Sequence, residues 1–347
     1  MRIALHIMFA ALLAAGLSLT SNIVRAASDE EFYSGQAITI FQSAGAGGIY
    51  SAYATTFAPY LEKYIPGHPT IVVDYMPGAG GIRATNFINS NAPKDGSVLG
   101  LVHSSVPFAP LFGISAARYD PMKLNWIGAM NADTGICVAW HESDVKTWDD
   151  LFTKEFFVGS TGAGSQMEIL PHMINELFGT KISVIPGYTG GNDVFVAMER
   201  GEVDGRCGAI IAGINATRPT WFSDNLVSVL IQIAMERNSL FPDVPALGEF
   251  VNDQHTRDVL ELALSPMNMF GLIVAPPGVP EERVATLRAA YHAAMNDPEF
   301  IANAARIRIE IAEVSSGQLY QQISRAYNMP PDVVASYREA VNLTGSR

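Results

Sequence analysis

Four short loops rich in glycine each lie between an apolar run and a helical pattern. They are residues 43–48 (SAGAGG), 77–81 (PGAGG), 160–165 (STGAGS) and 187–191 (GYTGG). Glycine lets the backbone approach a bound group closely, and a helix start presents unpaired N–H groups with partial positive charge. Four such loops predict a cleft that holds an anion by its backbone N–H groups.

Side chains at these loops, and at one predicted strand end, complete the candidate site. His103 follows the strand 98–102 together with Ser104 and Ser105, and it either contacts the ligand or is a structural histidine. Ser160, Thr161 and Ser165 are typical N-cap residues, which is compatible with an anion site at the same helix start. The candidate ligand-binding residues are Gly47, Gly48, Ile49, Tyr50, Gly80, Gly81, His103, Ser104, Ser105, Ser160, Thr161, Gly162, Ser165, Tyr188, Gly190 and Arg206.

Arg206 lies in the apolar run 203–210, where a guanidinium needs a partner. A carboxylate is the best geometric match for its forked N–H groups. The sequence leaves two interpretations open: Arg206 faces the cleft and binds a carboxylate, or it forms a surface salt bridge with Asp204 or Glu202.

The sequence offers little support for catalysis. It has no Gly-x-Ser-x-Gly elbow, no HExxH and no GxxxxGK[ST] phosphate loop. The run 141–144 (HESD) is expected to be a solvated turn, so we predict no metal site and no cofactor. The alternative function that remains in this class is a secreted serine-type hydrolase using His103.

Composition and the N-terminus limit the location and the partners. The net charge of −12 over 347 residues argues against binding to nucleic acid or to an anionic membrane surface. Residues 1–26 have the basic start, the apolar stretch and the small residues at a cleavage site that are typical of a signal peptide. We therefore predict an exported protein outside the cytoplasm, without membrane insertion after cleavage, and expect a monomer; the resemblance given below implies the periplasm.

The rest of the chain alternates strand and helix patterns, which indicates α/β layers with mostly parallel sheets. Strands are expected near 38–41, 71–73, 98–102, 135–140, 156–159, 182–185, 203–210, 226–234 and 270–275. Helices are expected from Ile82 and Thr147, over 165–178 and 192–200, after Pro280 and after Ser315.

The two cysteines lie in short apolar runs that we expect to be neighbouring strands. Cys137 and Cys207 form an even pair in an exported chain, which permits one disulfide. Two buried thiols are the alternative.

An ordered set of motifs resembles a known family. The motifs PGAGG (77–81), APKDG (92–96), STGAGS (160–165), PGYTGG (186–191) and APPGVP (275–280) are similar to those of the periplasmic solute-binding receptors of tripartite tricarboxylate transporters, the Bug family. The resemblance covers roughly residues 36–310.

The resemblance implies a type II periplasmic binding protein, with two α/β lobes joined by hinge strands and a ligand cleft between them. By position, lobe 1 would comprise 28–129 and 240–347, and lobe 2 would comprise 130–239. The implied ligand is a carboxylate, either a di- or tricarboxylate or an aromatic acid, which the receptor delivers to membrane transporter subunits. A receptor for a sensor kinase is the alternative partner arrangement.

Two positions depart from the family pattern. Tyr50 stands where the family has an acidic residue, and it either contacts the ligand or packs on the first helix. Arg206 adds a base to a strand that loses its last acid in this chain. The change at Tyr50 argues against a ligand whose amino group needs a carboxylate partner. If Arg206 faces the cleft, the lost acid and the gained base both favour a more anionic ligand.

Overall fold

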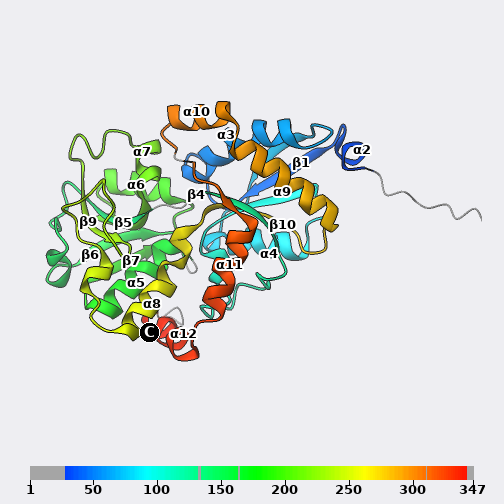
Figure 1. The fold of residues 1–347 in the computed structure, drawn as a ribbon. Coiled ribbons are helices and arrows are strands. Elements are labelled where there is room, and N and C mark those ends of the chain that lie inside the picture. Colours follow the sequence, from blue (N-terminus) through cyan, green and yellow to red (C-terminus); the bar gives the residue numbers. More distant parts are fainter. Residues whose placement is uncertain (1–27, 132–133, 163–164, 310, 342–347) are drawn as a thin grey trace, which may run out of the picture.

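A computed structural model describes residues 28–131, 134–162, 165–309 and 311–341. The predicted signal peptide, 1–26, lies outside these residues. The described chain forms two lobes side by side, each built on one β-sheet with helices packed on it (Figure 1). The type II binding-protein fold expected from the sequence is confirmed.

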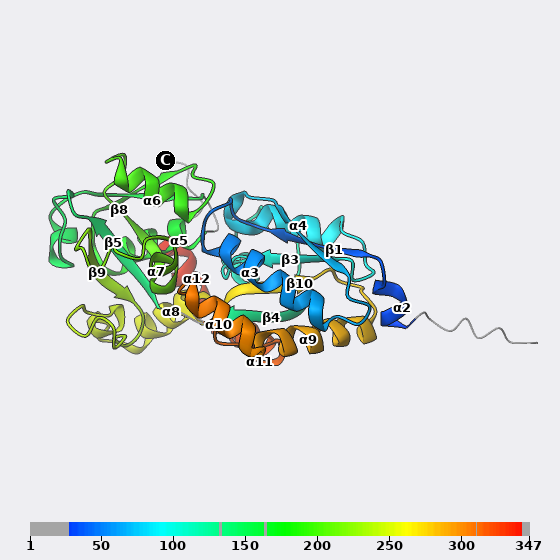
Figure 2. The same cartoon turned by 90° about the horizontal axis from the view of Figure 1, so that it is seen from above.

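The first lobe contains a six-stranded sheet in the order β11-β4-β10-β3-β1-β2. Its strands are β1 (Ala37–Gln42), β2 (Thr70–Tyr75), β3 (Val98–Val102), β4 (Asn125–Asn131), β10 (Phe270–Ala275) and β11 (Val314–Ser315). Its helices are α2 (Asp29–Tyr33), α3 (Ile49–Tyr64), α4 (Ile82–Ser90), α9 (Glu281–Met295), α10 (Pro298–Arg306) and α11 (Ser316–Tyr327). Figure 2 shows α10 beside α3, against which it packs.

The second lobe contains a five-stranded sheet in the order β7-β6-β8-β5-β9. Its strands are β5 (Gly135–Trp140), β6 (Phe156–Ser160), β7 (Ile182–Pro186), β8 (Gly205–Ile210) and β9 (Val227–Ile233). The helices on it are α5 (Gln166–Phe178), α6 (Gly191–Glu199) and α7 (Ile211–Thr217), with α8 (Gln254–Leu264) and α12 (Pro331–Val341) packed against α5. The lobe boundaries near 129 and 240 stay predictions.

The expectation of mostly parallel sheets is wrong. β1 pairs parallel with β2 and β3, and β6 with β7 and β8, but β10 runs antiparallel to β3 and β4, and β5 antiparallel to β8 and β9. The apolar runs of β5 and β10 predict burial but carry no information on direction. The antiparallel direction of β10 matters for the site, because its first residue lies beside the end of β3.

The helix expected from Thr147 is also wrong in length. The structure has only a short 3₁₀-helix at Asp149–Phe152, in which the Asp150 carboxylate accepts hydrogen bonds from the backbone N–H groups of Lys146 and Thr147. These bonds close a turn, as acidic side chains often do in turns.

The strands that carry the two cysteines are neighbours, as expected. β5 pairs with β8, and the structure joins Cys137 and Cys207 by a disulfide between them. Both cysteines are fully buried.

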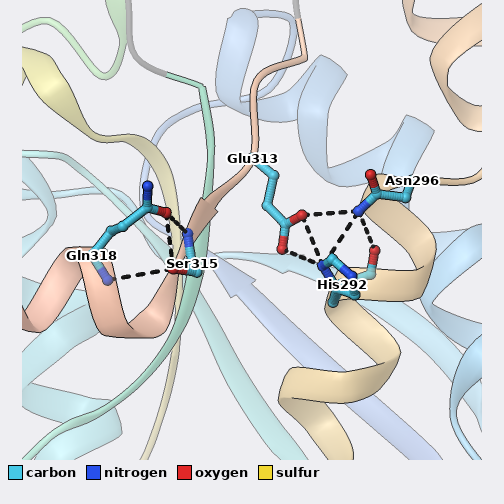
Figure 3. Close-up of polar contacts among 5 residues, drawn as sticks. All are labelled: His292, Asn296, Glu313, Ser315 and Gln318. Atoms are coloured by element: carbon cyan, nitrogen blue, oxygen red, sulfur yellow. Dashed lines mark hydrogen bonds and ion pairs between the residues drawn. The ribbon is translucent and has the colours of Figure 1, made fainter.

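The C-terminal end of α9 is fastened to the segment that precedes α11 (Figure 3). The Glu313 carboxylate lies 2.9 Å from His292 Nδ1, and Asn296 Nδ2 donates to the same carboxylate at 2.9 Å. Ser315 and Gln318 form a capping box at the start of α11. These contacts hold β11 in place along β4, at the edge of the first sheet.

Candidate ligand-binding cleft

Two adjacent cavities, of about 60 and 50 Å³, lie between the lobes. Both are lined by the same central residues, which come from both lobes: Tyr50, His103, Met167, Arg206, Gly208, Ile210 and Phe270. The first cavity extends toward the loops 44–48 and 190–192, and the second toward Ser104, Ser105, Ser165, Gln166 and Met267.

Four helices begin at the cleft. Their N-cap residues are Gly48 for α3, Ser165 for α5, Gly190 for α6 and Ile210 for α7, and no described side chain caps any of the four. Uncapped helix starts carry partial positive charge and free N–H groups, which suits an anion. The loop-to-helix design read from the sequence is therefore present.

The first and fourth glycine loops touch across the cleft. The Gly45 N–H donates to the Thr189 carbonyl at 3.3 Å. A Cβ added at Gly45 would lie 2.9 Å from Thr189 Oγ1, so glycine is needed for this approach. The structure therefore has its two lobes in contact at the cleft mouth.

Arg206 reaches the cleft from β8 and lines both cavities. Its guanidinium lies 4.6 Å from the centre of the Phe195 ring, and Nη1 donates to the Gly191 carbonyl at 3.3 Å. Among the described residues, no acidic side chain forms an ion pair with it, and its Nε is buried without a hydrogen-bond partner. Burial lowers the pKa of Arg206 to about 10, which leaves the group charged at neutral pH.

The salt-bridge alternative for Arg206 is wrong. Asp204 instead accepts a hydrogen bond from the Phe157 N–H at 2.9 Å, and Glu202 lies 3.8 Å from Arg200. Along β8, Asp204 and Arg206 are held by different neighbours, so they do not meet.

Tyr50, His103 and Phe270 form an aromatic wall of the cleft. The Tyr50 ring lies 4.6 Å from the His103 ring and 4.5 Å from the Phe270 ring, measured between centroids. Burial lowers the pKa of His103 to about 4, against a hydrogen bond to the Gly80 backbone that raises it. His103 is therefore neutral at physiological pH. Tyr50 both packs and lines the cleft, so its two readings are compatible.

Several polar atoms at the second cavity have no partner among the described residues. Ser105 and Ser165 are 1% and 2% exposed, and neither Oγ makes a hydrogen bond. Both side-chain atoms of Gln166 are buried and unpartnered as well. Because buried polar groups are rarely left unsatisfied, these groups indicate a site for a polar ligand group.

Nine of the candidate residues line the cavities: Gly48, Ile49, Tyr50, His103, Ser104, Ser105, Ser165, Gly190 and Arg206. The remaining seven do not line either cavity: Gly47, Gly80, Gly81, Ser160, Thr161, Gly162 and Tyr188.

For most of these seven residues the structure shows contacts other than the lining of the cavities. Gly80 hydrogen-bonds His103 through its backbone, and Gly81 lies against the same ring. The Ser160 hydroxyl donates to Glu168 and accepts the Gly162 N–H. Tyr188 packs near Gly159. Gly47 lies close to Asn192. The described contacts assign no role to Thr161.

Sequence reasoning missed the apolar part of the cleft, which includes Met167, Phe195, Ile210, Met267 and Phe270. Phe270 is at the start of β10, and Leu272 pairs antiparallel with Val102, so the start of β10 meets the end of β3. In a parallel sheet only the carboxyl ends of the strands lie at the site. The expected parallel direction therefore did not predict that Phe270, the first residue of its strand, lies there. The helical spacing of Met167 and Phe195 is equally typical of core positions.

Together, two α/β lobes and a cleft with a buried arginine define a type II periplasmic binding protein. The chain belongs to the family described as the tripartite tricarboxylate transporter family receptor, whose sequence model matches residues 64–334. Members of this family are receptors rather than enzymes, so the hydrolase alternative is wrong.

Individual relatives agree with this assignment. A Cupriavidus necator protein, described as the UPF0065 protein in the gbd 5' region, is 26% identical over 284 residues, which are 78% of this chain and 80% of the relative. The periplasmic binding protein BugD has a similar fold, with a TM-score of 0.69 at 20% identity over 89% of this chain and 98% of that one. MatC from Rhodopseudomonas palustris with bound malate has a TM-score of 0.67 at 20% identity, over 88% and 99%.

Proposed function

We propose that this chain is an exported receptor that captures a small carboxylate between its lobes, closes on it and delivers it to a tripartite membrane transporter. Arg206 is the observation that carries the proposal. It is a charged guanidinium in a closed cleft, without an acidic partner among the described residues. A buried charge is costly unless an opposite charge meets it, and a carboxylate is the natural complement of the guanidinium fork.

Further support comes from the backbone and from relatives. The uncapped starts of α3 and α7 face the same cavities and have no acidic residue in the first turn, so they favour negative charge. MatC, a protein of similar fold, has malate bound. The candidate ligands are a di- or tricarboxylate or an aromatic acid, bound by the nine lining residues named above.

Export of the mature chain is part of the proposal. Residues 1–26 would be removed as a signal peptide, leaving a periplasmic monomer. Within the part of the chain that the structure describes, no helix is long and apolar enough to cross a bilayer. Mass spectrometry of the exported protein tests the cleavage site after Ala26.

Binding is tested by calorimetric titration of residues 27–347 with carboxylates, amino acids and sugars. We expect saturable binding of one equivalent of a carboxylate, which is recovered unchanged, and a raised melting temperature because the ligand binds the native state. Binding of sugars or amino acids alone would overturn the proposal.

Delivery to a transporter, rather than to a sensor kinase, needs a separate measurement. Uptake of the labelled ligand is compared in cells that lack this protein, and in the same cells supplied with the wild type or with Arg206→Met. If the protein is a transport receptor, the wild type should restore uptake and Arg206→Met should not. Normal uptake without the protein, together with lost ligand-dependent signalling, would favour the sensor.

A further inference from the structure

We propose that the ligand carries a single carboxylate on an unsaturated or apolar body, and that its other end is a neutral hydrogen-bonding group. This inference rests on the proposed function and narrows its ligand class. It follows from how charge, apolar surface and unpartnered polar atoms are distributed between the two cavities.

Positive charge in the cleft matches one carboxylate. Among the described residues that line the two cavities, Arg206 is the one lysine or arginine. Arg218 lies beside Phe195 but pairs with Glu199 at 2.5 Å, and His103 is neutral because burial lowers its pKa to about 4. A second carboxylate would therefore be buried without a cation, which is strongly unfavourable.

The helix starts do not raise the number of carboxylates that the cleft can hold. The first turns of α5 and α6 contain Glu168 and Asp193, whose negative charges offset the partial positive charge there. The first turns of α3 and α7 have no acidic residue, and both starts face the first cavity. The carboxylate is thus best placed in the first cavity, between Arg206 and the start of α3.

The wall shared by the two cavities is apolar and aromatic. It combines the neighbouring rings of Tyr50 and Phe270 with Met167 and Ile210. Such a surface favours a planar or apolar body over a hydrated polyanion.

The second cavity ends in neutral polar groups from both lobes. Ser105 follows β3 and Ser165 is the residue before α5, and both hydroxyls are buried without partners among the described residues. Gln166 adds an unpartnered amide. Hydroxyls and amides both donate and accept, so they satisfy a neutral hydroxyl or amide without any charge.

The test is calorimetric titration of the mature protein with two matched series. One is benzoate, 4-hydroxybenzoate, terephthalate and 4-hydroxybenzamide, and the other is hexanoate, 6-hydroxyhexanoate and adipate. In a series that binds, we expect the hydroxylated monocarboxylate to be tightest, the dicarboxylate at least about 10-fold weaker, and the uncharged amide not to bind.

The outcomes separate the two proposals. A dicarboxylate that binds as tightly as its monocarboxylate overturns the inference, while the carboxylate receptor stands. The inference is also overturned, and the carboxylate receptor also stands, if no monocarboxylate of either series binds but a di- or tricarboxylate does. If no carboxylate binds at all, both proposals fail.

Variants test the neutral end of the site. Changing both Ser105 and Ser165 to alanine should reduce the preference for the hydroxylated acid over the unsubstituted acid by about 5-fold, the effect of about one hydrogen bond. The exposed Ser115→Ala is the control. A preference ratio that does not change would place the ligand's polar end elsewhere.

Discussion

Arg206→Met should weaken ligand binding while making the ligand-free protein more stable. Burial lowers the pKa of Arg206 from 12.5 to about 10. Each pKa unit corresponds to about 1.4 kcal/mol, so the charged side chain costs the closed, ligand-free fold about 3 kcal/mol. Methionine keeps much of the apolar stem and removes this cost, so we expect the free energy of unfolding to rise by up to about 3 kcal/mol.

The same substitution leaves a bound carboxylate without its cation. Truncating one partner of a buried charge pair costs about 2–5 kcal/mol, which is about 30-fold to several thousand-fold in Kd. Calorimetry measures the affinity, and urea denaturation measures the stability. Arg200→Met is the matched control, because Arg200 is exposed and lies 3.8 Å from Glu202. Unchanged affinity, or a loss of stability together with affinity, would refute the reasoning.

Three further predictions follow from the same contacts. Gly45→Ala inserts a Cβ 2.9 Å from Thr189 Oγ1 and should hold the lobes apart; X-ray scattering with ligand should then give a larger radius of gyration than the wild type, and an equal radius would contradict this. Burial lowers the pKa of His103 to about 4, so the contribution of His103 to the free energy of unfolding should be complete above about pH 6.5 and fall by up to about 3 kcal/mol as the pH drops to 4. In melting curves, His103→Asn should flatten this pH dependence, and the exposed His68→Asn should not. Equal slopes in all three proteins would count against a buried neutral His103. The disulfide closes a loop of 70 residues, worth about 4 kcal/mol in the chain-entropy model; reductant should lower the melting temperature of the wild type but not that of Cys137→Ala/Cys207→Ala, and a shift of equal size in both would argue against this stabilisation.

The helix starts at the site could be predicted from the sequence because their cause is local. Glycine next to an apolar run and before a helical pattern is a feature of a few consecutive residues, and the four loops indeed precede α3, α4, α5 and α6. The need of Arg206 for a partner could be predicted for a related reason, because a guanidinium within an apolar strand requires an opposite charge whatever the fold. The sequence did not decide whether Asp204 supplies that charge, because the Phe157 N–H that Asp204 accepts comes from a distant strand.

The apolar wall could not be predicted, because it depends on strand direction and on contact between lobes. Phe270 lines the cleft only because β10 runs antiparallel to β3, and a run of buried apolar residues reads the same in either direction. Likewise, α8 packs against α5, although more than seventy residues separate them in the chain. Such long-range packing has no signature in either helix alone.

The contacts across the cleft explain how a ligand could drive closure. One hydrogen bond, from the Gly45 N–H to the Thr189 carbonyl, joins the first and fourth glycine loops. Tyr50 of the first lobe lies close enough to Arg206 of the second to affect its pKa, so part of the burial of Arg206 arises from closing. Burial of this charge costs up to about 3 kcal/mol in all, and the part of that cost that arises from closing opposes closure in the absence of ligand. A carboxylate offsets this cost only when both lobes surround it, and a ligand shifts a conformational equilibrium only through such differential affinity. An uncharged analogue of the same shape should therefore fail to close the cleft.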